Sequence, residues 1–195
     1  MLTENEITRA AERLDEAERT KQQIRMLTLE HPEMTLDDAY AVQAAWMARK
    51  VAGGRRVNGH KIGLTSRAMQ SALNINEPDS GVLLDDMFFA DGGEVPTARF
   101  IQTRIEAELA FVMGRDLAGA DVTLFDVLRA TEYVVPALEI LDTRILRIDP
   151  ETKKTRTARD TIADNAANAG IVTGGRPMKP DTDDMRWVRS CRRTR

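Results

Sequence analysis

The chain has 195 residues, of which 42% are hydrophobic and 30% are charged. This composition excludes a disordered chain and suits one folded domain. A net charge of −3 argues against nucleic acid or an anionic membrane as a partner. The single cysteine excludes an internal disulfide, and the acidic N-terminus lacks the features of a signal peptide. We therefore expect a cytoplasmic protein without a membrane span.

Two helices are predicted near the N-terminus. Thr3 and Glu6 have the spacing of a capping box, and a thin apolar stripe with helical spacing follows them. This pattern predicts an amphipathic helix that packs weakly on the body of the protein or on a partner subunit. Thr35 and Asp38 form a second capping box, and Gly53-Gly54 predicts the end of the helix that begins there.

The chain changes character after these glycines and alternates short apolar runs with turns. The predicted strands are 57–64, 82–89, 94–97, 104–113, 133–141 and 169–173, with short helices at 66–73 and 123–131 and a loop at 74–80. Pro136 restricts its strand to a sheet edge or a bulge, because proline cannot donate to a ladder. Helices followed by short strands predict an α+β fold, with a mixed sheet that curls toward a barrel or roll.

The C-terminal end has an unusual composition. The last ten residues hold five arginines around Trp187 and Cys191. A charge run of this kind is usually a solvated tail. We favour an out-of-frame segment that replaces a strand, because Met185–Val188 begins like one. We therefore expect a chain that is C-terminally truncated or frameshifted, with three parts: a helical region 1–54, an incomplete catalytic domain 55–185 and an aberrant tail 186–195.

Three glutamates form the first candidate site. Glu106 and Glu108 are two apart in a predicted strand and point to the same side, while the alternate residues 105, 107, 109 and 111 are expected to fill the opposite face. Two carboxylates ~4–6 Å apart repel by roughly 3–4 kcal/mol at an effective dielectric near 20. The Glu face is also expected to be buried toward its C-terminal end. Glu139 lies alone in a second apolar strand. Three such carboxylates are suitable ligands for Mg²⁺ or Mn²⁺. The alternative, in which Glu106 and Glu108 simply face solvent, stays open.

Lys61 and Asp79 are further candidates. Lys61 lies between two glycines in a strand, where it is either a surface lysine or a fixed cation beside a developing enolate oxygen. His60 points to the opposite face and is expected to be a core or hydrogen-bonding residue. Asp79 belongs either to an ordinary turn or to a loop that presents an acid to the site. The segment 160–170 is either a capped helical turn or a polar loop that closes over a ligand, and its spacing does not decide between them.

The chain resembles the hydratase/decarboxylase branch of the fumarylacetoacetate hydrolase superfamily. The resemblance extends to about Pro180 and rests on five ordered segments: 59–66, 83–88, 104–111, 136–139 and 160–170. It implies the fold of that superfamily and a divalent metal, Mg²⁺ or Mn²⁺, held by Glu106, Glu108 and Glu139. It also implies that Lys61 stabilises an enolate or transfers a proton, and that Asp79 is an acid/base candidate.

The resemblance further implies a small 2-oxo dicarboxylate as substrate. The expected activity is a hydro-lyase reaction of aromatic compound catabolism, in which water adds to an alkene conjugated with the 2-oxo group. The alternatives are a decarboxylase or a hydratase of a related dienoate, and an inactive truncated subunit. The charged N-terminal helices suit a homo-oligomer. The residue that binds the distal carboxylate cannot be chosen from the sequence.

Overall fold

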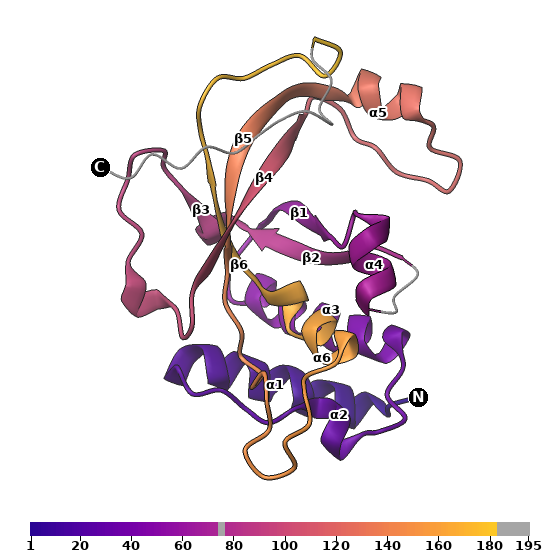
Figure 1. Cartoon of the computed structure of the whole chain (residues 1–195), viewed down its shortest axis with the longest axis vertical. Helices are drawn as coiled ribbons and strands as arrows, with labels where there is room; N and C mark the ends of the chain where they lie inside the picture. Colours follow the sequence, from indigo (N-terminus) through magenta and orange to yellow (C-terminus); the bar gives the residue numbers. More distant parts are fainter. Residues whose placement is uncertain (74–76, 183–195) are drawn as a thin grey trace.

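The computed structural model describes residues 1–73 and 77–182. Its helices are α1 (Glu4–Thr20), α2 (Leu27–Glu30), α3 (Leu36–Ala52), α4 (Arg67–Leu73), α5 (Leu124–Ala130) and α6 (Ala158–Ala163). Its strands are β1 (Val57–Gly63), β2 (Asp79–Leu84), β3 (Phe88–Phe89), β4 (Arg104–Met113), β5 (Thr131–Leu141) and β6 (Asn168–Thr173). Helices α1, α2, α3 and α6 gather at one end of the molecule, and β4 and β5 rise away from them (Figure 1).

The strands form two sheets. β1 and β2 pair antiparallel as a two-stranded sheet, and the second sheet has the order β3-β6-β5-β4. In the second sheet β3 and β6 are parallel, while the other neighbours are antiparallel. The predicted α+β fold with a mixed sheet is therefore confirmed.

The predicted helix caps are confirmed in detail. Thr3 and Thr35 each accept a hydrogen bond from a backbone N–H three residues on, and the acidic residue there reaches back to the cap. Thr123 caps α5 in the same way, and α3 ends at Gly53 as predicted. The short helix α2 was not predicted, because four residues are too few to show a helical period.

The larger core lies among α1, α3 and α6 and the end of β2. Its fully buried large side chains include Leu14, Met26, Leu27, Met34, Val42, Trp46, Leu84 and Ile145. A buried ion pair crosses this core: Arg144 Nε lies 2.5 Å from Asp164 Oδ1, and the guanidinium stacks 5.0 Å above the Trp46 ring. Both charged side chains are almost fully buried. The pair therefore ties the segment after β5, which carries Arg144, to the C-terminal end of α6.

Some predicted strand boundaries are wrong. The strand predicted at 82–89 is split, because a single 3-10 turn at Asp85–Met87 separates β2 from β3. No strand forms at 94–97, where the chain instead leads into a 3-10 turn at Thr97–Arg99. The loop predicted at 74–80 ends earlier, since β2 begins at Asp79, and residues 74–76 lie outside the described residues.

The placement predicted for Pro136 is also wrong. β5 lies between β4 and β6, so Pro136 is in an inner strand. The last residue of β5 paired with β6 on this side is Ala137, opposite Thr173, and Pro136 O accepts from Gly174 N just beyond β6. In an antiparallel ladder the N–H and C=O of a residue face the same neighbour. A backbone N–H at position 136 would therefore face the chain just beyond the end of β6, outside the β5–β6 ladder.

The burial expected for β4 is not observed among the described residues. Ile105 and Phe111 are 56% and 49% exposed on one face, and Val112 is 42% exposed on the other. β4 is the edge strand of its sheet, and the helices that build the larger core pack around β2. A smaller apolar cluster of Phe89, Phe100, Ile140 and Val172 packs on the face of the sheet that carries Ile105, because Ile105 pairs directly with Ile140.

The arginine-rich segment 186–195 lies outside the described residues, and the three-part division of the chain stays a prediction. In the part of the chain that the structure describes, none of the helices combines the length and the apolar character that crossing a bilayer requires.

Candidate active site

Three glutamate side chains meet on one face of the β4–β5 ladder. The register places Glu106 directly opposite Glu139, and Glu108 opposite Ala137. Directly opposed residues share a face, and so do residues two apart in one strand. One carboxylate oxygen from each of the three glutamates lies within 4.8 Å of the other two. Glu139 is 5% exposed, whereas Glu106 and Glu108 lie at the solvent-exposed edge of the group.

The two-stranded sheet brings Lys61 and Asp79 to the same place. Lys61 is on β1 and Asp79 begins β2, where it pairs with Gly63. Lys61 Nζ lies 3.8 Å from Asp79 Oδ1 and 3.8 Å from Glu139 Oε1. The structure therefore places all five predicted site residues around one centre between the two sheets.

Two carboxylate oxygens in this centre lack hydrogen-bond donors. Asp79 Oδ1 and Glu139 Oε1 are buried, and no group in the described part of the chain donates to either. Each is too far from Lys61 Nζ for a hydrogen bond, because donor and acceptor are usually 2.7–3.2 Å apart. Buried polar atoms are nearly always paired in folded proteins, so two unpaired oxygens, each 3.8 Å from Lys61 Nζ, indicate a place for a ligand.

The glutamates carry unfavourable charge in the absence of a cation. Burial raises the pKa of Glu139 to about 7. The positive charge of Lys61 lowers this pKa, whereas the negative charges of Glu106, Glu108 and Asp79 raise it further. Burial also raises the pKa of Glu108, and repulsion from Glu106 adds to it. Groups in a cleft whose pKa is shifted by burial and by specific neighbours are typical of functional sites.

Two glycines allow the close approach of the parts. A Cβ at Gly63 would overlap the carboxylate of Asp79 and would lie 2.7 Å from Lys61 Nζ. A Cβ at Gly81 would lie 2.6 Å from the backbone oxygen of Asn165. Glycine in these strands therefore marks close approach by other groups.

The segment 160–170 contains the capped helical turn, whereas a polar loop that closes over a ligand stays a prediction. Thr157 and Asp160 form a capping box that begins α6. After Asp164 comes a left-handed turn in which Ala166 O accepts a hydrogen bond from Lys61 Nζ at 3.0 Å. Sequence reasoning assigned no role to this turn, because three consecutive non-glycine residues at positive φ are unusual and leave no pattern of spacing.

His60 does not have the predicted environment. It is exposed on β1, and no hydrogen bond to its side chain is formed among the described residues. β1 is a strand of a two-stranded sheet, so the face opposite Lys61 has no second layer over it in the described structure.

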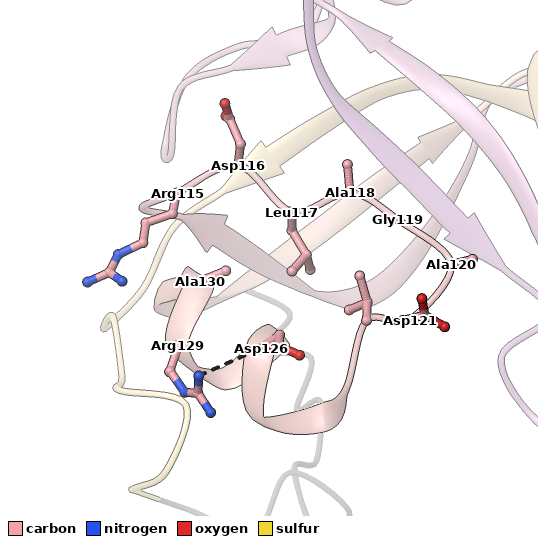
Figure 2. Close-up of a pocket in the computed structure, with 11 residues that line it drawn as sticks. Arg115, Asp116, Leu117, Ala118, Gly119, Ala120, Asp121, Asp126, Arg129 and Ala130 are labelled. Atoms are coloured by element: carbon pink, nitrogen blue, oxygen red, sulfur yellow. Dashed lines mark ion pairs between the residues drawn. The ribbon is translucent and has the colours of Figure 1, made fainter.

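A separate hollow of about 500 Å³ lies between α5 and the loop that precedes it (Figure 2). Arg115 and Asp116 point away from it, and Arg129 pairs with Asp126 along α5 at 3.6 Å (Figure 2). None of the five predicted site residues lines this hollow. We therefore place the candidate active site at the glutamates, where the unpaired oxygens and the shifted pKa values are.

Comparison with known proteins identifies the family of this chain. The chain is 59% identical over 181 residues to a 2-oxo-hept-4-ene-1,7-dioate hydratase of Escherichia coli, a match that covers 93% of this chain and 68% of the relative. The chain belongs to the hydratase/decarboxylase branch of the fumarylacetoacetate hydrolase superfamily. A scan against models of protein families finds no match.

Other members of this branch are similar over the same extent. A 2-keto-4-pentenoate hydratase of Paraburkholderia xenovorans is 42% identical over 190 residues, covering 97% of this chain and 68% of its own length. Among solved structures, 4-oxalocrotonate decarboxylase from Pseudomonas putida G7, complexed with magnesium and adipate, superimposes with a TM-score of 0.86 at 35% identity. That match covers 95% of this chain and 68% of the decarboxylase, so both chains have the same fold.

Proposed function

We propose that this chain is a metal-dependent hydratase that converts 2-oxohept-4-ene-1,7-dioate into 4-hydroxy-2-oxoheptanedioate. The observation that carries the proposal is the single centre where three glutamates, Lys61 and Asp79 meet. The 59% identity to the Escherichia coli hydratase supports the choice of substrate.

The residues of the centre suit a divalent metal. Glu106, Glu108 and Glu139 supply hard oxygen ligands within 4.8 Å of one another, and a cation would offset the burial and repulsion that raise the Glu139 pKa. We assign Mg²⁺ or Mn²⁺ to these three side chains, a choice supported by the magnesium in the Pseudomonas putida decarboxylase. When bound, such an ion acts as a Lewis acid toward the 2-oxo group of the substrate.

Lys61 and Asp79 are assigned the proton chemistry. The reaction removes a proton from C3 and delivers one to C5, which moves the double bond to C3–C4, in conjugation with the 2-oxo group. Water oxygen then bonds to C4, and a proton returns to C3. We assign to the Lys61 ammonium the stabilisation of negative charge on the 2-oxo oxygen, and to Asp79, whose Oδ1 is unpaired, the acceptance of a proton.

The direct test is turnover by the purified 195-residue chain with Mg²⁺. We expect the absorbance of the dienol form to decay without release of CO₂. Glu106→Gln and Lys61→Met should each slow the decay by on the order of 100-fold or more, whereas His60→Gln, an exposed change on the same strand as Lys61, should not. Release of CO₂ would instead establish the decarboxylase activity of the solved relative, and no turnover by a folded, metal-binding chain would refute the proposal.

Ligand binding is testable without turnover. Mg²⁺ and oxalate together, where oxalate represents the 2-oxo carboxylate end of the substrate, should raise the melting temperature more than either alone. The exposed apolar side chains of β4 and the charged helix α1 also support a homo-oligomer. Light scattering at several protein concentrations tests that proposal.

A further inference from the structure

The turn after α6 has an uncommon backbone conformation. Asn165, Ala166 and Ala167 have φ values of 54°, 51° and 59°, a left-handed conformation that residues with a side chain rarely adopt. All three residues are buried, with exposed fractions of 0%, 1% and 8%. Surrounding structure must therefore hold the turn in place.

The side-chain amide of Asn165 fastens the turn to β2. Its Oδ1 accepts from Val82 N at 2.7 Å, and its Nδ2 donates to Val82 O at 2.9 Å. The amide thus binds both backbone groups of one residue, as a neighbouring strand would. Gly81 permits the approach, because any Cβ there would meet the backbone oxygen of Asn165. Asn168 adds a second donor to Val82 O at 3.0 Å.

The fastened turn aims one carbonyl at Lys61. Ala166 O accepts from Lys61 Nζ at 3.0 Å, whereas the carboxylate oxygens of Asp79 and Glu139 are both 3.8 Å away. In the described structure this carbonyl is the hydrogen-bonded partner of the ammonium group. Lys61 Nζ is thus equally far from the two carboxylate oxygens and forms a hydrogen bond with neither, and two of its three ammonium hydrogens stay available to other groups.

We propose that Asn165 is a positioning residue that acts through the carbonyl of Ala166 to fix the ammonium group of Lys61 for the reaction. The inference rests on the proposed function for the role of Lys61, but the placement of Lys61 is testable without metal or turnover. The neighbouring Ala166 provides a matched control, because Ala166→Gly keeps the carbonyl and suits a positive φ.

The first experiment is ¹H–¹⁵N NMR of the lysine ammonium groups in the metal-free chain, with the Lys61 signal assigned by its loss in Lys61→Met. A hydrogen-bonded, partly buried ammonium exchanges slowly enough to give a distinct signal. We expect this signal in the unmodified chain and in Ala166→Gly, and its loss in Asn165→Gly. If Asn165→Gly does not fold, Asn165→Asp serves at pH 8, because it keeps the shape but loses the donor to Val82 O. An unchanged Lys61 signal in the folded Asn165 variant would overturn the proposal.

The second experiment is a double-mutant cycle on turnover. Misplacing a group by about 1 Å costs on the order of 100-fold in rate, so kcat should fall by about that factor in Asn165→Gly while the Mg²⁺ dissociation constant stays close to that of the unmodified chain. In the Lys61→Met background the same substitution should have no further effect on residual turnover. If the fold losses in kcat from the two substitutions instead multiply in the double variant, Asn165 acts independently of Lys61 and the proposal is overturned. If no variant turns over, the proposed function fails, and the NMR result alone decides the positioning.

Discussion

Replacing Glu139 with glutamine separates the two roles that charge plays at this centre. Glu139 is 5% exposed, and its pKa is raised to about 7, chiefly by burial. In the metal-free chain its ionised form therefore destabilises the fold, whereas in the metal-bound chain the same charge is a ligand. Glu139→Gln removes the charge with little change in shape, so it should have opposite effects in the two states.

The expected magnitude follows from the pKa. A carboxyl whose pKa rises from 4.5 unfolded to about 7 folded loses roughly 3 kcal/mol of stability as the pH rises through that window, at about 1.4 kcal/mol per unit. The sign is that of a raised pKa, because the folded chain binds the extra proton between these values. At pH 8 without metal, Glu139→Gln should thus be more stable than the unmodified chain by up to about 3 kcal/mol, and at pH 4.5 by almost nothing.

The measurement is urea unfolding at pH 4.5 and pH 8, each with EDTA and with Mg²⁺. At pH 8, Mg²⁺ should stabilise the unmodified chain by RT ln(1 + [Mg²⁺]/Kd) and should stabilise Glu139→Gln far less. Glu132→Gln is the control, because it removes an exposed carboxylate from the same strand and should change stability by no more than about 0.5 kcal/mol. If Glu139→Gln is no more stable than the unmodified chain at pH 8 in EDTA, the argument from burial and repulsion is wrong.

Two other substitutions test the packing around the centre. Gly63→Ala places a Cβ against the Asp79 carboxylate, so we expect kcat to fall on the order of 100-fold through a shift of about 1 Å; unchanged turnover would contradict that contact. Asp164→Asn leaves the buried guanidinium of Arg144 without its charge partner, which should lower the free energy of unfolding by about 3–5 kcal/mol. Urea unfolding measures the second effect, and a loss below 1 kcal/mol would show that water reaches the arginine.

The sequence predicted best what depends on neighbours in the chain. Capping boxes at Thr3 and Thr35 are contacts over three residues, so their spacing alone identified where two helices begin. The bounds of β4 were predicted from a run of ten residues in which apolar and charged residues first alternate and apolar residues then follow. The common direction of Glu106 and Glu108 needs only the two-residue period of a strand.

The sequence could not predict what depends on the meeting of separate segments. Pro136 fits in an inner strand because β6 ends beside it. The end of β6 lies nearly 40 positions further along the chain, so the sequence around Pro136 does not predict it. The exposed environment of His60 depends on the absence of a second layer over β1 in the described structure. The turn at Asn165 is stabilised by its contacts with Val82 and Gly81, so the residues of the turn itself do not predict it.

The centre lies at a junction of the two sheets, which the hydrogen bond from Asn168 of β6 to Val82 of β2 also joins. Lys61 and Asp79 come from β1 and β2, whereas the glutamates come from β4 and β5 of the other sheet. The closest charged contact between the sheets at this point is Lys61 with Glu139, at 3.8 Å, and two buried oxygens beside it lack donors among the described residues. A cation bound by the glutamates would therefore neutralise charge at a junction of the fold, so ligand binding and the stability of that junction should rise together.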